Sequence, residues 1–316
     1  MSVEGGTKAI VAALVANLGI AVTKLAAWLL TWSSSMLAES IHSLADSGNQ
    51  LLLLIGGKRA RRGATPEHPF GYGRERYIYA FIVSIVLFSV GGLFASYEGI
   101  HKIELTLHGE PNELLASSWW WLPLVVLVVA IGLEAYSFGT AIKESRIAKG
   151  TATWSQFIRR AKAPELPVVL LEDAAAMLGL IFALFGVGLT LLTGNAIFDG
   201  AFTLAIGVLL IVVAVILALE TKSLLLGESA TPEHVADIER AILAGNDIER
   251  IIHMKTLHLG PEELLVAAKI AVSRDETASQ LTEEIDGAER RIREAVPIAR
   301  VIYLEPDLYN PERDAN

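Results

Sequence analysis

The chain contains no cysteine, which removes both disulfide bonds and thiolate metal ligands. Any metal site must therefore use histidine and carboxylate side chains, together with water or backbone oxygens. The sequence also lacks a phosphate-binding glycine loop, a nucleophile elbow and an ATP site, so an enzyme is not expected. The first apolar run is of spanning length and lacks a small-residue cleavage pattern, so we expect no cleavable signal peptide.

Apolar residues dominate the composition. They make up 53% of the 316 residues, which is too large a share for an ordinary globular protein. The net charge of −9 falls in the last part of the chain, where residues 228–316 carry 19 Asp and Glu against 10 Lys and Arg. We therefore predict a transmembrane domain over residues 1–226 and a C-terminal domain over 227–316. Six stretches are long enough to cross a bilayer as helices: about 9–30, 36–57, 77–100, 117–142, 166–192 and 197–219.

The second stretch carries polar residues that cannot all face lipid. His42 and Asp46 stand four apart, so they share one face of a helix, and Glu39 extends this stripe. A charge at the bilayer centre costs about 2.5 to 3.5 kcal/mol on insertion scales, so these residues indicate a functional site. An imidazole and a carboxylate at this spacing are typical of ligands that bind a divalent metal.

Basic residues predict the orientation, because they favour the cytoplasmic side. They gather between the second and third stretches and between the fourth and fifth, so we expect both termini in the cytoplasm. Asp46 lies 12 residues before Lys58, and Asp173 lies 11 residues after Lys162. At 1.5 Å per residue, both carboxylates lie roughly 17 Å above this edge, near the middle of a hydrocarbon core about 30 Å thick. They are therefore expected to share one site.

Three ligands of a tetrahedral metal site are evident: His42, Asp46 and Asp173. The fourth could be Glu172, Glu39 or water. We favour Glu172, because its neighbour already points inward and a modest rotation of the helix would let both share the site.

Two other intramembrane carboxylates have alternative roles. Glu39 is either a ligand or the partner of Lys24 in a structural ion pair. Glu134, among apolar residues of the fourth stretch, is either a proton relay, an extra ligand or the acceptor of a structural hydrogen bond, and we favour the structural role.

Two motifs resemble the cation diffusion facilitator family: Ser-Met-Leu-Ala-Glu-Ser-Ile-His-Ser-Leu-Ala-Asp at 35–46 and Pro-Glu-His-Pro-Phe-Gly-Tyr-Gly-Arg-Glu-Arg at 66–76. A third, Leu-Leu-Glu-Asp-Ala-Ala-Ala-Met-Leu-Gly at 170–179, looks like the branch containing zinc transporter nine. The resemblance implies a six-helix membrane domain, a cytoplasmic metallochaperone-like domain and a homodimer. It also implies export of a divalent metal in exchange for protons, by alternating access.

The chain departs from the resembled family at two places. Members usually carry a His or Asp four residues before the position of Asp173, where this chain has Val169. His42 favours zinc as substrate, while the missing ligand leaves manganese, iron or cobalt open. His68 matches a loop position that helps bind metal in some members, but Tyr72 replaces the usual second His, so we favour a role in shaping the loop.

The segment after Gly227 predicts a small α+β domain of the order αββαβ. Thr231 and Pro232 are typical of a helix start, and Gly260-Pro261 of a hairpin turn. The predicted elements are a helix from 231 to about 243, strands at 249–258 and 263–273, a helix at about 276–295 and a strand at 299–305.

This domain holds candidate metal residues of its own, His234, His253, His258 and Glu305. The resembled family has a His where this chain has Tyr303, so we favour dimerisation through the domain over metal sensing.

Together these features predict a divalent metal and proton antiporter, with zinc as the favoured substrate. Clustered carboxylates and an imidazole repel one another without metal and must lose protons to bind it, so the same groups can carry either ion. The alternatives are a non-transporting membrane metal-binding or scaffold protein and, less favoured, a channel. The expected partners are metal ions, protons, the lipid bilayer and a second copy, with no nucleic acid. We expect a prokaryotic plasma (inner) membrane, because no organelle-targeting segment is seen.

Overall fold

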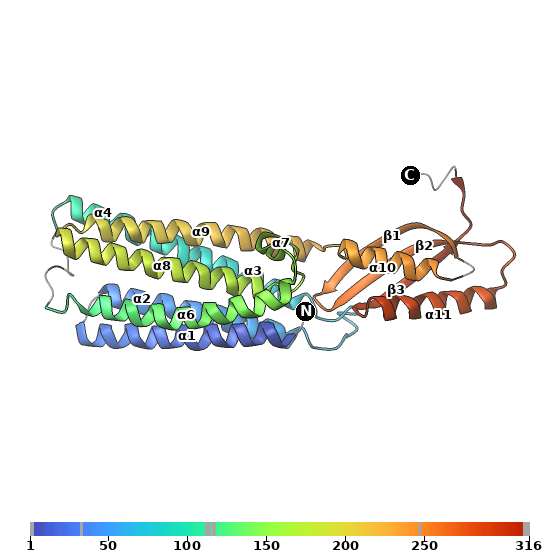
Figure 1. Cartoon of the computed structure of the whole chain (residues 1–316), viewed down its shortest axis with the longest axis horizontal. Coiled ribbons are helices and arrows are strands. Elements are labelled where there is room, and N and C mark those ends of the chain that lie inside the picture. The colour runs from blue at the N-terminus through green and yellow to red at the C-terminus, as the bar shows by residue number, and fades with distance from the viewer. Residues whose placement is uncertain (1–2, 32–33, 111–114, 116–117, 246–247, 312–316) are drawn as a thin grey trace. The chain divides into compact units, whose positions relative to one another are not determined.

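The structure, a computed structural model, describes the chain except for residues 1–2, 32–33, 111–114, 116–117, 246–247 and 312–316. The side chains of residues 3–5, 28, 30–31, 34–39 and 41–42 also lie outside the description. The chain forms two compact units, one of Met1–Arg59 and Glu75–Lys222 and the other of Ala60–Arg74 and Ser223–Asn316. Figure 1 shows helices in the first unit and a sheet with two helices in the second.

Long helices build the first unit, and they run side by side (Figure 1). In the described residues the single helices are α1 (Val3–Thr31), α2 (Ser34–Arg59), α6 (Leu122–Lys149), α8 (Glu165–Thr193) and α9 (Ile197–Leu226). One further long helix is a continuous run of three segments, α3 (Glu75–Val86), η1 (Leu87–Leu93) and α4 (Phe94–Leu107). The short α7 (Trp154–Arg160) precedes α8. Five of these spans, counted over the described residues, are long and apolar enough to cross a membrane. The exception, α2, has 26 residues but carries the polar side chains noted above. The predicted membrane helix bundle is confirmed.

The fourth predicted stretch, 117–142, is wrong at its start. A turn covers Ser118–Trp121, and α6 begins only at Leu122 because Pro123 occupies the first turn, where its missing N–H costs nothing. The helix also continues to Lys149, beyond the apolar residues, and ends at Gly150, whose φ of 55° is favoured by glycine. Apolar composition placed the span, and the proline and glycine set its ends.

Small residues let neighbouring helices of the first unit approach closely. A Cβ atom on Gly99 of α4 would collide with the backbone of Leu204 in α9. A Cβ atom on Gly200 of α9 would lie 3.0 Å from the backbone nitrogen of Ile103 in α4. Van der Waals contact between backbones is a main source of helix association in lipid, where burial of apolar surface gives little driving force.

The second unit has the predicted αββαβ order. Its elements are α10 (Pro232–Leu243), β1 (Ile248–Gly260), β2 (Glu263–Val272), α11 (Ala278–Ala295) and β3 (Ala299–Asp307). The sheet order is β1-β2-β3, with β1 antiparallel and β3 parallel to β2. Thr231 caps α10 by accepting a hydrogen bond from the backbone of His234. Alternate β2 residues are buried in the same core as α10 and α11, so the fold class is confirmed.

The loop between α2 and α3 packs with the second unit. A Cβ atom on Gly260 would lie 2.8 Å from the Cα of Gly73, so the two backbones are in direct contact. The glycines at the end of the loop and at the hairpin turn are therefore required by packing. This contact fixes residues 60–74, including His68, on the unit that contains the sheet.

Candidate metal site in the helix bundle

A small cavity of about 50 Å³ inside the helix bundle is lined by four carboxylates from three helices. Asp46 comes from α2, Glu134 from α6, and Glu172 and Asp173 from α8. Asn17 of α1 also lines it. The sequence placed Asp46 and Asp173 at equal depth, and the structure places both on this one cavity. A polar space of this size has room for a few water molecules.

Asp173 is held in place by α6. It is 1% exposed, and the hydroxyl of Ser137 donates a 2.6 Å hydrogen bond to its Oδ2 atom. A buried carboxylate needs such donors or a cation, because burial removes its water. The hydrogen bond fixes the orientation of the carboxylate and occupies one of its oxygens, leaving Oδ1 as the more available of the two.

Glu172 has a different environment. It is 4% exposed, Asn49 donates a 2.8 Å hydrogen bond from Nδ2 to Oε1, and Gln50 donates another of 2.8 Å from Nε2 to Oε2. Both donors come from α2, so the carboxylate joins α2 to α8. Each oxygen of Glu172 is therefore committed to an amide, although we had favoured this residue as the fourth ligand.

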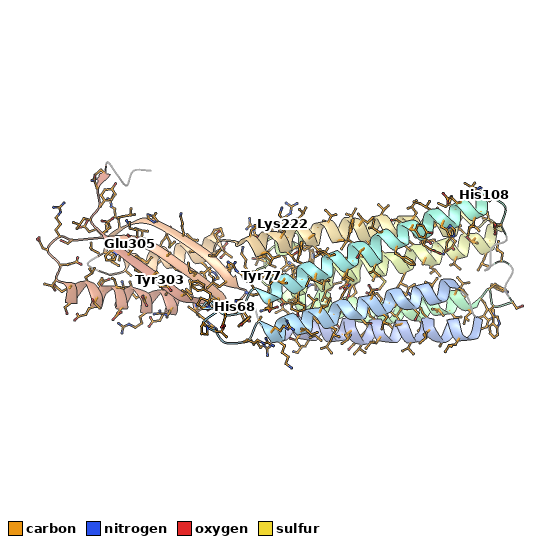
Figure 2. All side chains as sticks on the ribbon, turned by 180° about the vertical axis from the view of Figure 1, so that it is seen from behind. His68, Tyr77, His108, Lys222, Tyr303 and Glu305 are labelled. Atoms are coloured by element: carbon orange, nitrogen blue, oxygen red, sulfur yellow. The ribbon has the colours of Figure 1, made fainter. Side chains whose placement is uncertain are left out.

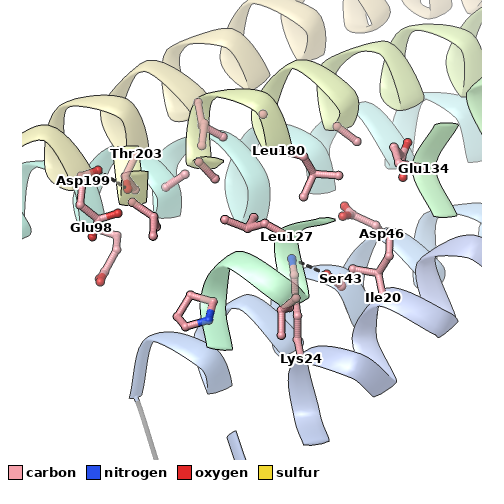
Figure 3. A pocket seen from close by; sticks show the side chains of 18 of the residues that line it. Ile20, Lys24, Ser43, Asp46, Glu98, Leu127, Glu134, Leu180, Asp199 and Thr203 are labelled. Carbon is pink, nitrogen blue, oxygen red and sulfur yellow. Dashed lines mark hydrogen bonds between the residues drawn. The ribbon is translucent and has the colours of Figure 1, made fainter. Parts of the chain in front are cut away.

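Glu134 faces the cavity from α6. It is 1% exposed, and its buried Oε1 atom has no hydrogen-bond partner among the residues that the structure describes. Figure 3 shows its carboxylate turned toward Asp46 across the open space. The structural hydrogen bond that we favoured from the sequence is therefore not made by Oε1 within the described part of the chain.

Two predicted site residues, His42 and Glu39, belong to α2, but their side chains lie outside the described residues. Val169 is fully buried in the apolar core and does not line the cavity. In the described part of the chain, no three His, Cys, Asp or Glu side chains are grouped so that they could hold a metal ion as they stand. The ligand set of His42, Asp46 and Asp173 with Glu172 stays a prediction.

A larger cavity of about 150 Å³ continues from the central site (Figure 3). Asp46 and Glu134 lie at one end of it, and Glu98 and Asp199 lie toward the ends of α4 and α9. Near that end Lys102 forms an ion pair with Asp199 at 3.0 Å.

The cavity wall also holds a buried cation. Lys24 of α1 is 5% exposed and donates a 3.0 Å hydrogen bond from Nζ to the hydroxyl of Ser43. The wall of the larger cavity thus carries both basic and acidic side chains.

Where α3 and α8 begin, a buried ion pair joins these two helices. Arg76 donates from Nε to Oε1 of Glu165 and from Nη2 to Oε2 at 2.8 Å, and the two side chains are 13% and 7% exposed. Such a two-pronged guanidinium contact is among the strongest in proteins. Glu165 begins the helix that carries Asp173 eight residues later, a rise of about 12 Å. The ion pair therefore fixes the start of α8 below the central cavity.

The third long helix changes its geometry beside the cavity. Residues Leu87–Leu93 form η1, a π-helical segment between α3 and α4, and Leu87 lines the cavity. A π-helical segment contains an extra residue in its turn, and such segments are frequent at functional sites. Nothing in the apolar sequence of this segment had predicted it.

The histidines proposed for the second unit do not form a cluster in the residues that the structure describes. His258 is buried in β1 with Nδ1 3.3 Å from the carbonyl of Gly260, and His253 lies opposite Lys269 in the sheet. His68 lies beside the ring of Tyr72, with centroids 4.7 Å apart. Figure 2 shows His68 well apart from Glu305. Metal binding by this unit stays a prediction.

Glu305 instead belongs to a charged group on the sheet. Lys269 of β2 contacts Glu305 at 3.1 Å and Asp307 at 2.9 Å, both on β3. The hydrogen bonds to Asp307 and then to Glu305 raise the pKa of Lys269 above its ordinary value. These charges stabilise the pairing of β2 with β3.

The long apolar helices, joined to a small α+β domain, define an integral membrane protein. The cation efflux transmembrane domain matches residues 10–226. The chain belongs to this family, the cation diffusion facilitators, and the resemblance seen in its motifs is confirmed.

Several curated relatives cover most of the chain. The proton-coupled zinc antiporter SLC30A9, mitochondrial, of Xenopus laevis is 33% identical over 85% of this chain and 47% of its own length. The protein of the same name from Homo sapiens is 31% identical over 84% and 46%. Metal tolerance protein C4 of Arabidopsis thaliana is 28% identical over 83% and 56%. This chain therefore spans about half the length of the curated relatives that it matches.

Proposed function

We propose that the protein is a divalent metal and proton antiporter that exports zinc from the cytoplasm by alternating access. The observation that carries this proposal is the shared cavity of Asp46 and Asp173, which come from helices far apart in the sequence. A carboxylate pair inside a helix bundle is costly in a protein that only needs to be stable in lipid. The names of the relatives, proton-coupled zinc antiporter and metal tolerance protein, support transport of this kind.

His42, Asp46 and Asp173 bind the metal in this proposal. Without a metal, neighbouring carboxylates in a medium of low dielectric constant repel one another, and protons relieve the repulsion. Metal binding requires the ligands to release these protons. Metal and protons therefore exclude one another at a single site, and this couples their opposite movements.

Zinc is the preferred substrate because a site of imidazole and carboxylates suits it, with manganese, iron and cobalt as competitors. The basic residues around α2, α3 and α7 support cytoplasmic termini. We propose a prokaryotic plasma (inner) membrane and a homodimer joined through the second unit. The word mitochondrial is part of the relatives' names, and we do not propose that location for this chain.

The test is metal flux into sealed proteoliposomes under an imposed pH gradient, with zinc, manganese, iron, cobalt and cadmium compared. Asp173→Ala should abolish uptake, while Asp237→Asn, which changes a half-buried carboxylate of α10 in the second unit, should not. Gradient-driven uptake that depends on Asp173 would establish antiport and rank the metals. No uptake of any metal by the folded protein would favour a non-transporting role in metal binding or scaffolding.

A further inference from the structure

In the proposed transport site α8 contributes Asp173, and the structure indicates where a further ligand lies. Val169, one turn before Asp173, is fully buried in the apolar core and contributes nothing to the cavity. The next residue that could serve, Glu172, accepts hydrogen bonds from both Asn49 and Gln50. To turn toward a metal it would leave two buried amide groups unsatisfied, which is unfavourable.

Glu134 lines the cavity and keeps a carboxylate oxygen available, whereas Val169 lies away from the cavity and both oxygens of Glu172 accept hydrogen bonds. Glu134 lines both the small central cavity and the larger one that continues from it. It is 1% exposed, and its Oε1 atom has no hydrogen-bond partner within the described residues. A buried carboxylate oxygen without a donor is costly unless a cation or proton accompanies it. Figure 3 shows the carboxylates of Glu134 and Asp46 facing the same open space.

We propose that Glu134 of α6 is a ligand of the transported metal and supplies the coordination that α8 does not. This inference rests on the proposed function. The ligands then come from three helices, with Asp46 on α2, Glu134 on α6 and Asp173 on α8, and these carboxylates must move closer together to bind one ion. Glu172 joins α8 to α2 and serves the structure of the bundle. An additional oxygen ligand widens the range of metals that the site accepts toward manganese and iron.

The role of Ser137 agrees with this assignment. It lies three residues after Glu134 on α6 and donates its hydroxyl hydrogen to Asp173 at 2.6 Å. Residues three apart lie on the same face of a helix, so one face of α6 both orients Asp173 and presents Glu134. α6 is therefore part of the binding site and not only its support.

The experiment measures zinc affinity of the purified full-length protein in detergent by calorimetry, with the cobalt absorption spectrum as a second readout. Glu134→Gln should weaken zinc binding by more than about tenfold, since even partners that only orient a ligand contribute about 10- to 100-fold. The matched control is Glu144→Gln, the same change ten residues later on the same helix and away from both cavities, which should leave affinity unchanged.

Glu134→His distinguishes a ligand from a structural residue. If Glu134 binds the metal, the histidine variant keeps cobalt binding, and its spectrum changes as an oxygen ligand is replaced by nitrogen. If Glu134 only supports the fold, the spectrum of the bound cobalt stays that of the original protein, and the inference is overturned.

The outcomes also separate this inference from the proposed function. Binding that is lost in Asp173→Ala but unaltered in Glu134→Gln would reject only the role of Glu134. A native protein that binds no zinc would reject the proposed function itself.

Discussion

Ser137 of α6 donates a 2.6 Å hydrogen bond to Oδ2 of Asp173 on α8, and both groups are buried. The bond joins neighbouring helices at the depth of the central cavity, and it restricts the carboxylate to one orientation. Hydrogen bonds of this kind orient the side chains that bind metals in proteins.

Removing this hydroxyl should weaken zinc binding without removing a ligand. We expect Ser137→Ala to lower zinc affinity by about tenfold, because groups that orient ligands contribute about 10- to 100-fold. Calorimetry on the detergent-solubilised protein measures the change. The control is Ser145→Ala on the same helix, where another buried serine lies away from both cavities. Equal affinities of the two variants would show that the bond to Asp173 does not matter for binding.

The larger cavity should admit water-soluble reagents. Because the chain contains no cysteine, a single introduced thiol can be labelled without background. We expect Thr203→Cys, in the cavity wall on α9, to react rapidly with a charged methanethiosulfonate reagent. Ala214→Cys, on the same helix and 1% exposed, should react slowly. The measurement is the labelling rate of the two variants in membranes. Equal rates for Thr203→Cys and Ala214→Cys would show that water-soluble reagents do not enter the larger cavity.

The pair of amides that binds Glu172 should contribute to stability. Glu172→Gln replaces an acceptor oxygen by an NH₂ group, so one of the donors from Asn49 or Gln50 loses its partner. A buried donor left unsatisfied costs about 1 to 3 kcal/mol, so the unfolding midpoint should fall. Thermal unfolding in detergent measures it. A simultaneous Gln50→Leu change should recover part of the loss, and an additive loss would refute this account.

The ion pair of Arg76 and Glu165 should show coupling in a double-mutant cycle. Removing one partner leaves a buried charge and should cost about 3 kcal/mol or more, whereas removing both should cost less than the sum. Arg76→Leu, Glu165→Leu and the double variant are compared by thermal unfolding. Glu289→Gln, which breaks the more exposed pair with Arg293, should change stability by less than about 1 kcal/mol. Strict additivity would show that the two residues do not interact.

The group around Lys269 predicts a dependence on alkaline pH. Its pKa in the folded state is raised above the ordinary value of 10.5 by the hydrogen bonds to Asp307 and Glu305. The stabilisation is therefore complete below the ordinary pKa and is lost as the pH rises through the higher folded value. We expect the difference in unfolding midpoint between the native chain and Lys269→Met to shrink as the pH rises above this ordinary value. A constant difference would mean that the charge of Lys269 is unimportant.

The sequence predicted those features whose causes are local. Thr231 and Pro232 start α10, and Gly260 ends β1, because capping and turn preferences depend on a few adjacent residues. The expectation that Asp46 and Asp173 share one site came from counting along helices of constant rise. Both carboxylates line the central cavity, although their role as ligands stays a prediction.

The sequence could not predict how the helices are rotated against one another. The membrane helices are apolar on nearly every side, so no polar face fixes which residues meet. The bonds from Asn49 and Gln50 to Glu172 therefore appear only in the structure. For the same reason, Glu134 was recognised as a buried carboxylate, but its approach to Asp46 was not foreseen.

The π-helical segment η1 determines how α4 is rotated about the helix axis relative to α3. Each residue of an α-helix turns the chain by about 100° and each residue of a π-helix by less, so rewinding Leu87–Leu93 as α-helix with every residue kept would rotate α4 relative to α3. Lys102 would then no longer point at Asp199, although neither residue had changed. The pairing of charges near the end of the larger cavity thus depends on the π-helical winding of a segment that carries no charge.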